Sequence, residues 1–297
     1  MHLRELTIAI ETAFPSLGLE LQRAATWVLN HPREVGLMSM RKQAESAGVT
    51  ANTMIRLAQS VGFESYIPFR KVFQDGLTHE APHYTERVKK LQVGMDREFD
   101  DELLRTHVSN VQSPTLSNSP DAIAQAVHRM SQARRIFFLG ARSCFAISYH
   151  FSYAYSMIAD NGVLVHGLGG TYPDQLDSAG PEDLLVCITQ NPYGRQALEA
   201  AKLCSQEGVS VLALTDSKIA PIQAYASQSL LFDAGTPSYF HSMVGSLALV
   251  ERLLAKLAAT GGEPMLRRIE AFEQRLGASS AYLSHPQAKA KSSKKSP

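Results

Sequence analysis

The chain has 297 residues, of which 44% are hydrophobic and 19% are charged, and its formal net charge is +1. This composition is typical of a folded protein, and no apolar run reaches the roughly 18–20 residues that a membrane-spanning helix needs. Three cysteines, Cys144, Cys187 and Cys204, form no CxxC pair, which favours reduced thiols over disulfides or a zinc site. We therefore expect a cytoplasmic protein with no membrane contact, metal site or cofactor.

Residues 1–77 show helical spacing of their apolar side chains and no strand-like alternation. Asn30, His31 and Pro32 end one apolar stripe, because proline cannot continue a helix. Residues 1–75 hold eight Lys/Arg against seven Asp/Glu, so charge alone does not indicate a nucleic-acid partner. The spacing predicts an all-α domain over residues 1–77.

Residues 40–63 have the pattern of a helix-turn-helix. Ala44 is small where two helices would cross, and Gly48, four residues later, suits the tight turn between them. Thr50 then stands at an N-cap position, ahead of a helix whose apolar side chains face inward. An ordinary helical hairpin with a polar outer face has the same spacing, so the pattern alone leaves both interpretations open.

The outward face of the second helix carries side chains suited to reading DNA. Residues at the start of a recognition helix reach base edges, where asparagine pairs with adenine and arginine with guanine. Basic side chains nearby are suited to phosphates. We expect base contacts from Thr50, Asn52, Thr53 and Arg56, and phosphate contacts from Arg41, Lys42, Arg70 and Lys71.

Residues 78–97 mix charge, proline and glycine without a sustained period, which predicts a linker. Two helices are expected next, at about 98–112 and 120–132, because the sequence SPTLSNSP between them is typical of a loop.

From Arg135 onward, short apolar runs alternate with helical segments. Such runs are typical of parallel strands covered by helices on both faces. The pattern predicts a doubly wound α/β domain over residues 98–276, closed by two helices within 240–276. A lysine- and serine-rich tail over 277–297 is expected to be disordered.

Both parts resemble one bacterial family. HPREV, SMRKQAESAGVTANTMIRLAQSVGF and SYIPFRKVF, in this order, are similar to the N-terminal domain of RpiR/MurR-type regulators. Residues 49–56 correspond to the run that opens the family's recognition helix, and 61–63 to the run that closes it. Residues 98–276 resemble a sugar-isomerase-type (SIS) domain. The resemblance implies double-stranded operator DNA and a small-molecule effector as partners, and a homodimer or homotetramer.

The expected effector site lies at the carboxyl ends of the strands, where open α/β sheets bind small molecules. Ser143 offers a hydroxyl at a helix N-terminus, which favours an anionic group. In the loop after the third strand, Pro192 and Gly194 stand where the family has phosphate donors, so a planar acid or a larger ligand is favoured over a simple phosphosugar. The candidate ligand-binding residues are Gly140, Arg142, Ser143, Thr189, Asn191, Tyr193 and Arg195.

We interpret the chain as a non-enzymatic, DNA-binding transcription regulator whose SIS domain senses an anionic metabolite and modulates operator binding. The alternative is a SIS-fold sugar-phosphate isomerase with an N-terminal oligomerisation module, but no acid–base pair is evident near the loop. A sensor of a protein partner without DNA is disfavoured by Asn52, Thr53 and Arg56. Three scattered histidines are expected to be surface or packing residues, not metal ligands: His150, His166 and His241.

Overall fold

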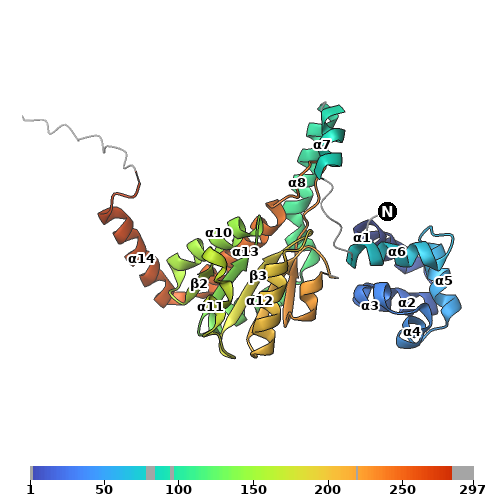
Figure 1. Cartoon of the computed structure of the whole chain (residues 1–297), viewed down its shortest axis with the longest axis horizontal. Helices are drawn as coiled ribbons and strands as arrows, with labels where there is room; N and C mark the ends of the chain where they lie inside the picture. The colour runs from blue at the N-terminus through green and yellow to red at the C-terminus, as the bar shows by residue number, and fades with distance from the viewer. Residues whose placement is uncertain (1–2, 78–83, 94–96, 219, 283–297) are drawn as a thin grey trace, which may run out of the picture.

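The computed structural model describes residues 3–77, 84–93, 97–218 and 220–282 (Figure 1). The helices of the N-terminal part, blue in Figure 1, pack around one apolar core that includes Leu57, Phe69 and Phe73. They are α1 (Leu3–Ala13), the short 3-10 turn η1 (Phe14–Ser16), α2 (Leu19–Asn30), α3 (Pro32–Leu37), α4 (Met40–Ser46), α5 (Ala51–Ser60) and α6 (Tyr66–Leu77).

A buried polar side chain fixes the arrangement of three of these helices. The side-chain amide of Gln43, on α4, donates hydrogen bonds of 2.9 Å to the carbonyl oxygens of Val35 and Met38, at the end of α3. The hydroxyl of Tyr66, on α6, donates to the amide oxygen of Gln43. Because a buried amide without partners costs free energy, these bonds specify how α3, α4 and α6 pack.

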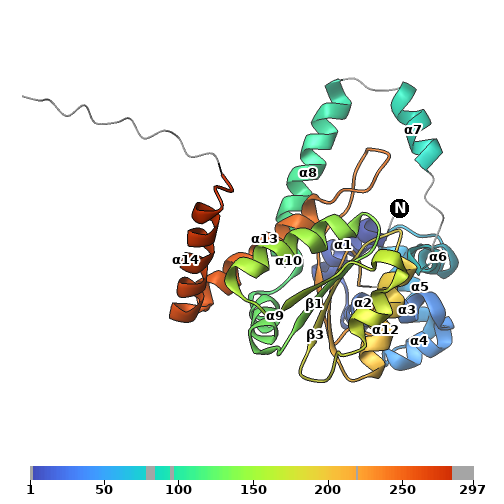
Figure 2. The same ribbon diagram turned by 60° about the vertical axis from the view of Figure 1, so that its left-hand side comes forward.

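The second part is a parallel five-stranded sheet with helices on both faces, as predicted (Figure 2). Its strands run in the order β2-β1-β3-β4-β5. They are β1 (Ile136–Gly140), β2 (Gly162–Val165), β3 (Leu184–Thr189), β4 (Ser210–Thr215) and β5 (Gln228–Leu231). Every residue of β1 and β3 is buried, which explains their continuous apolar sequences.

Different helices cover the two faces of the sheet. One face packs against α9 (Pro120–Gln132), α10 (Cys144–Ile158) and α13 (Val244–Thr260). The other face carries α11 (Tyr172–Leu176), α12 (Arg195–Gln206) and η3 (Pro221–Ala224), and the 3-10 turn η2 (Leu168–Gly170) precedes α11 without burying a residue. Since α10 follows β1 and α12 follows β3, the chain leaves these neighbouring strands toward opposite faces. This switch point is where open α/β sheets bind ligands.

The loop expected at residues 113–120 is mostly helical. Helix α8 (Arg97–Ser117) continues through Pro114, which has no N–H to donate. The carbonyl of Asn110, which this N–H would have met, accepts a 2.8 Å hydrogen bond from the Ser113 hydroxyl instead. The same hydroxyl accepts the backbone N–H of Asp233, beyond β5. Ser113 thus compensates for the proline, and the predicted break is wrong.

Tertiary hydrogen bonds hold the end of α8 against the sheet. The Asn118 side-chain amide donates to the carbonyl of Leu231, on β5, and accepts the Leu231 N–H, each at 2.7 Å. Arg252, on α13, donates to the carbonyl of Pro114. Helix α8 therefore belongs structurally to the α/β part.

Part of the expected linker is also helical, since residues 84–93 form α7 (Tyr84–Val93). No residue of α7 is buried, so apolar periodicity could not reveal it. Residues 78–83 and 94–96 of the expected linker, and 283–297 of the expected tail, lie outside the described residues.

The helix α14 (Gly262–Ala278) follows α13, as predicted. Among the described residues no helix is both long and apolar enough to cross a bilayer.

An ionic cluster supports the start of β3. The buried carboxylate of Asp183 accepts hydrogen bonds from Arg134 at 2.7 and 3.0 Å, from Arg135 at 3.0 Å, and from the Gly180 N–H at 2.9 Å. Burial alone would raise the pKa of this carboxyl. The hydrogen bonds from the two guanidinium groups outweigh burial and hold the pKa well below its usual range.

Candidate DNA-reading helix and effector site

Helices α4 and α5 form the predicted helix-turn-helix. Gly48 has a φ of +65° in the turn between them, a conformation that favours glycine. The Val49 N–H donates to the carbonyl of Ala44 at 2.9 Å and closes the end of α4. Thr50 caps α5, because its hydroxyl accepts the N–H of Thr53 at 3.2 Å.

The outward face of α5 is built from side chains one helical turn apart. Asn52 and Arg56 are both exposed and lie four residues apart, so they share one face. Gln59, three residues beyond Arg56, is exposed too. The sequence interpretation missed Gln59, although the same spacing indicates it.

Two threonines predicted to read bases have structural partners. Thr53 is only 8% exposed, and its hydroxyl lies 2.9 Å from the hydroxyl of Thr50. The placement of Thr53 on the outward face was wrong, because helical periodicity turns it toward the capping residue. The pair Thr50–Thr53 shapes the N-terminus of α5 and leaves Asn52 and Arg56 as its protruding polar side chains.

The four expected phosphate-binding residues fall into two groups. Arg41 and Lys42 are exposed in the first turn of α4. The half-buried guanidinium of Arg70 instead donates to the carbonyls of Val35, Gly36 and Leu37, and so caps the C-terminus of α3. Lys71 forms an exposed ion pair with Asp75 at 2.6 Å. The structure thus gives Arg70 a capping role that the sequence analysis did not anticipate.

The first effector loop connects β1 to α10. Gly140 ends β1 where a Cβ atom would lie 2.3 Å from the carbonyl oxygen of Cys144, so only glycine fits. Arg142 is exposed and has a φ of +55°. Ser143 precedes the first residue of α10, and its hydroxyl makes no capping bond, since the first N–H groups of this helix donate to the carbonyls of Ala141, Arg142 and Ser143.

The second effector loop connects β3 to α12. It meets the first loop, since a Cβ atom on Gly194 would lie 3.2 Å from the Cβ of Ala141. Thr189 is buried at the end of β3, whereas Asn191 and Arg195 are exposed. The structure therefore brings the two predicted loops together at the switch point.

Tyr193, in this second loop, contacts Asp216, which directly follows β4. The Tyr193 hydroxyl is hydrogen-bonded with Asp216 and Ser217. A carboxylate oxygen of Asp216 also accepts the Asn191 N–H at 3.0 Å. Burial raises the pKa of the Asp216 carboxyl, although these hydrogen bonds oppose the rise. Tyr193 thus fastens the loop to the end of β4, a structural role beside the expected ligand contact.

Two residues next to Ser143 were not predicted as ligand-binding residues. His241, expected to be a surface or packing histidine, places Nε2 2.8 Å from the Ser143 Oγ. Gln190 is 2% exposed and donates from its amide to the carbonyl of Ser242 at 3.0 Å, while its Oε1 has no hydrogen-bond partner in the described structure. Because Ser143 and His241 are 98 residues apart, no local motif could join them.

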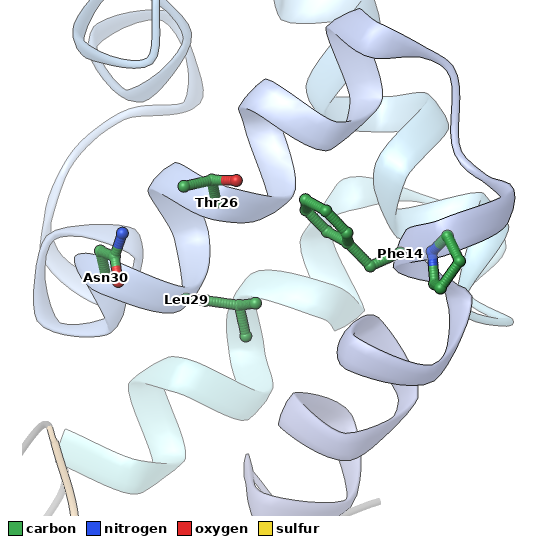
Figure 3. Close-up of a pocket in the computed structure, with 5 residues that line it drawn as sticks. Phe14, Thr26, Leu29 and Asn30 are labelled. Carbon is green, nitrogen blue, oxygen red and sulfur yellow. The ribbon is translucent and has the colours of Figure 1, made fainter. Parts of the chain in front are cut away.

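Two hollows lie away from these loops. One of about 330 Å³, between η1 and α2, is lined by Phe14, Pro15, Thr26, Leu29 and Asn30 (Figure 3). It carries no charged side chain. A groove of about 1000 Å³ lies between α9, the C-terminal ends of α10 and α13, and the start of α14. Since α10 runs back from the carboxyl end of β1, this groove lies toward the amino ends of the strands. Across the described ranges, no group of three His, Cys, Asp or Glu side chains could hold a metal ion.

Comparisons with known proteins agree with this architecture. The SIS domain family model matches residues 129–256. The chain is 22% identical over 228 residues to the uncharacterized HTH-type transcriptional regulator YfhH of Escherichia coli, covering 75% of this chain and 79% of that protein. It is 26% identical over 220 residues to the HTH-type transcriptional regulator HexR of Pseudomonas aeruginosa, covering 72% of this chain and 74% of that protein.

The sugar isomerase domain of an RpiR transcription factor from Sphaerobacter thermophilus superposes with a TM-score of 0.57 at 22% identity, covering 60% of this chain and 99% of that chain. The chain therefore has a SIS domain and is similar to HTH-type transcription regulators.

The chain also shares its fold with NanR of Vibrio vulnificus, solved with ManNAc-6P, at a TM-score of 0.55 and 17% identity, covering 93% of this chain and 100% of that chain. A stretch of 235 residues is 24% identical to the bifunctional protein glk of Burkholderia mallei, covering 78% of this chain but 35% of that longer protein. The matches to named HTH-type regulators support the regulator interpretation over the isomerase alternative.

Proposed function

We propose that this regulator binds double-stranded operator DNA through α5, in the cytoplasm, and that an acidic metabolite at the switch point of the sheet changes this binding. The main support for DNA binding is the capped helix α5, which presents Asn52 and Arg56 on one exposed face. Arg41 and Lys42 add positive charge at the start of the neighbouring helix, where phosphates would lie.

The effector class follows from the groups around the first loop. A hydroxyl, an imidazole and a helix N-terminus at Ser143 and His241 favour an anionic group. Exposed Arg142 and Arg195 add two guanidinium groups from the two adjoining loops. We place a sugar phosphate or a sugar acid here, and the NanR structure with ManNAc-6P is support from the same fold. Because Pro192 has no N–H, the second loop offers one backbone donor fewer to this group, so we expect the two guanidinium groups to supply part of the binding.

Replacing Arg56 by alanine is expected to weaken operator binding by about 1–3 kcal/mol, the worth of one bidentate contact with guanine. Gel retardation of promoter DNA, with a scrambled duplex as competitor, measures this loss. Arg105→Ala is the control, because it removes one exposed positive charge on α8, away from α5. If a normally folded Arg56→Ala protein binds the operator as tightly as wild type, α5 does not read bases through Arg56.

We further propose a homodimer or homotetramer that pairs through α10. Tyr149 and Tyr153 are 54% and 44% exposed, and their rings stack with centroids 6.4 Å apart. Exposed aromatic patches often mark interfaces. By contrast, the apolar helix α13 buries Leu249, Leu253 and other apolar residues within the chain.

Light scattering at micromolar concentration is therefore expected to show at least a dimer, and Tyr153→Glu should shift the protein toward monomer, since a charge in an apolar interface is costly. Glu251→Gln, a surface change on α13, is the control. A wild-type protein that is strictly monomeric, with and without DNA, would refute the proposal.

A further inference from the structure

The loop between β5 and α13 brings His241 to the effector loops from a distant part of the chain. Its imidazole Nε2 lies 2.8 Å from the hydroxyl of Ser143, at the N-terminus of the fifteen-residue helix α10. Burial, and then the positive charge of Arg87, lowers the pKa of His241. A hydroxyl and an imidazole that meet at a helix N-terminus can both turn toward an anionic group.

A buried amide beside this pair independently indicates a ligand. Gln190 is 2% exposed and directly precedes Asn191, in the second effector loop. Its amide nitrogen is bound to the carbonyl of Ser242, the residue after His241, but Oε1 has no hydrogen-bond partner within the described structure. A buried oxygen without a donor costs free energy, so it suits a ligand hydroxyl or amine.

The same loop reaches the helix that leads toward the DNA-reading domain. The Phe240 ring lies against the His241 ring, with centroids 4.0 Å apart, and against the Tyr84 ring of α7, at 5.7 Å. Figure 2 shows this orange loop rising between α8 and α7. Arg87, also on α7, acts electrostatically on His241. Tyr84 is separated from the end of α6 by residues 78–83 alone.

We propose that Ser143, His241 and Gln190 bind the acidic and hydroxyl groups of the effector, and that Phe240 transmits this binding to α7. The inference rests on the proposed function. It adds His241 and Gln190 as ligand contacts and a path from the effector site to α7. An anion bound by His241 changes the position of its ring, and the adjacent Phe240 ring carries the change to Tyr84. Because α7 buries no residue, few contacts oppose its movement.

Inorganic phosphate is the probe for the ligand contacts, with the full-length protein. The ring resonances of His241, assigned with His241→Gln, are expected to shift saturably as phosphate is added at constant ionic strength. Ser143→Ala should raise the dissociation constant about tenfold, as expected for one lost hydrogen bond to a charged group. Ser143→Thr, which keeps the hydroxyl, should restore binding. The exposed His128, on α9, is the internal control and should not shift.

Hydrogen–deuterium exchange tests the route to α7. Phosphate is expected to change the exchange of residues 84–93 in wild type and not in Phe240→Ala, although this variant still binds phosphate. Tyr239→Ala is the matched control, since Tyr239 is an exposed aromatic residue of the same loop. Its response should equal that of wild type.

The ligand contacts are refuted if phosphate does not shift the His241 resonances, or if Ser143→Ala leaves the dissociation constant unchanged. The transmission to α7 is refuted if the exchange of α7 does not respond to phosphate in wild type, or if it responds equally in Phe240→Ala and wild type. Operator retardation without phosphate is measured separately. If it fails, the proposed function is wrong whatever phosphate does. If the protein retards operator DNA but phosphate does not change the exchange of α7, the proposed function stands and the transmission through Phe240 is wrong.

Discussion

Replacing Asp183 by alanine is expected to lower the free energy of unfolding of the α/β part by about 1–3 kcal/mol, because the hydrogen bonds of a buried carboxylate are lost and the Gly180 N–H is left without its acceptor. The carboxylate binds Arg134, Arg135 and the Gly180 N–H at once. Its loss therefore affects both the start of β1 and the turn before β3. Differential scanning calorimetry measures the change.

The single tryptophan, Trp27, offers an internal control for this variant. It lies on α2, so its fluorescence follows the N-terminal helices and should report an unchanged transition. Asp177→Ala removes an exposed acid from the same part of the chain and should change stability by less than about 0.5 kcal/mol. Equal transition temperatures for Asp183→Ala and wild type would show that the cluster is not stabilising.

The pH dependence of the same difference has a definite sign. The folded-state pKa of Asp183 lies below its unfolded value, near 3.9, so its contribution is fully present above that value and is lost as pH falls toward the folded-state pKa. The stability advantage of wild type over Asp183→Ala should therefore be constant near neutral pH and shrink below about pH 4.

Gly140→Ala is expected to destabilise the α/β part by about 1–3 kcal/mol and to abolish effector binding. The added Cβ would lie 2.3 Å from a backbone oxygen of Cys144, so the start of α10 must move away from β1. Ser143 moves with it and no longer meets His241. Calorimetric unfolding and effector-dependent operator retardation measure the two effects.

The control for this glycine is Gly235→Ala, where a Cβ atom meets no atom within 4 Å. It should unfold and respond to effector like wild type. A Gly140→Ala protein with normal stability and response would show that the β1–α10 turn yields easily, and the effector site would then not depend on its geometry.

The fold was largely predictable because its signals are local. Runs such as 184–188 are apolar throughout, since both faces of β3 are covered, and Gly48 and Thr50 mark the turn and cap of the helix-turn-helix. The predicted effector loops also meet, because parallel strands bring their carboxyl ends to one edge of the sheet.

The missed features depend on particular side-chain contacts. Thr53 turned inward because a hydroxyl on Thr50 was available to pair with it. The helix α8 passed through Pro114 because Ser113 replaced the lost donor. His241 joined Ser143 across 98 residues, through a loop without a regular period. Of these contacts, only that between Ser143 and His241 joins distant parts of the chain, whereas Thr53 and Ser113 meet partners three residues away.

The hydrogen bonds of Asn118 also limit how the sheet can grow. β5 is an edge strand, and exposed edges invite pairing with another chain. At Leu231 the Asn118 amide donates to the carbonyl and accepts the N–H, as a neighbouring strand would. A single side chain thus caps this edge at its carboxyl end. Further copies therefore cannot extend the sheet at Leu231 of β5 without displacing Asn118.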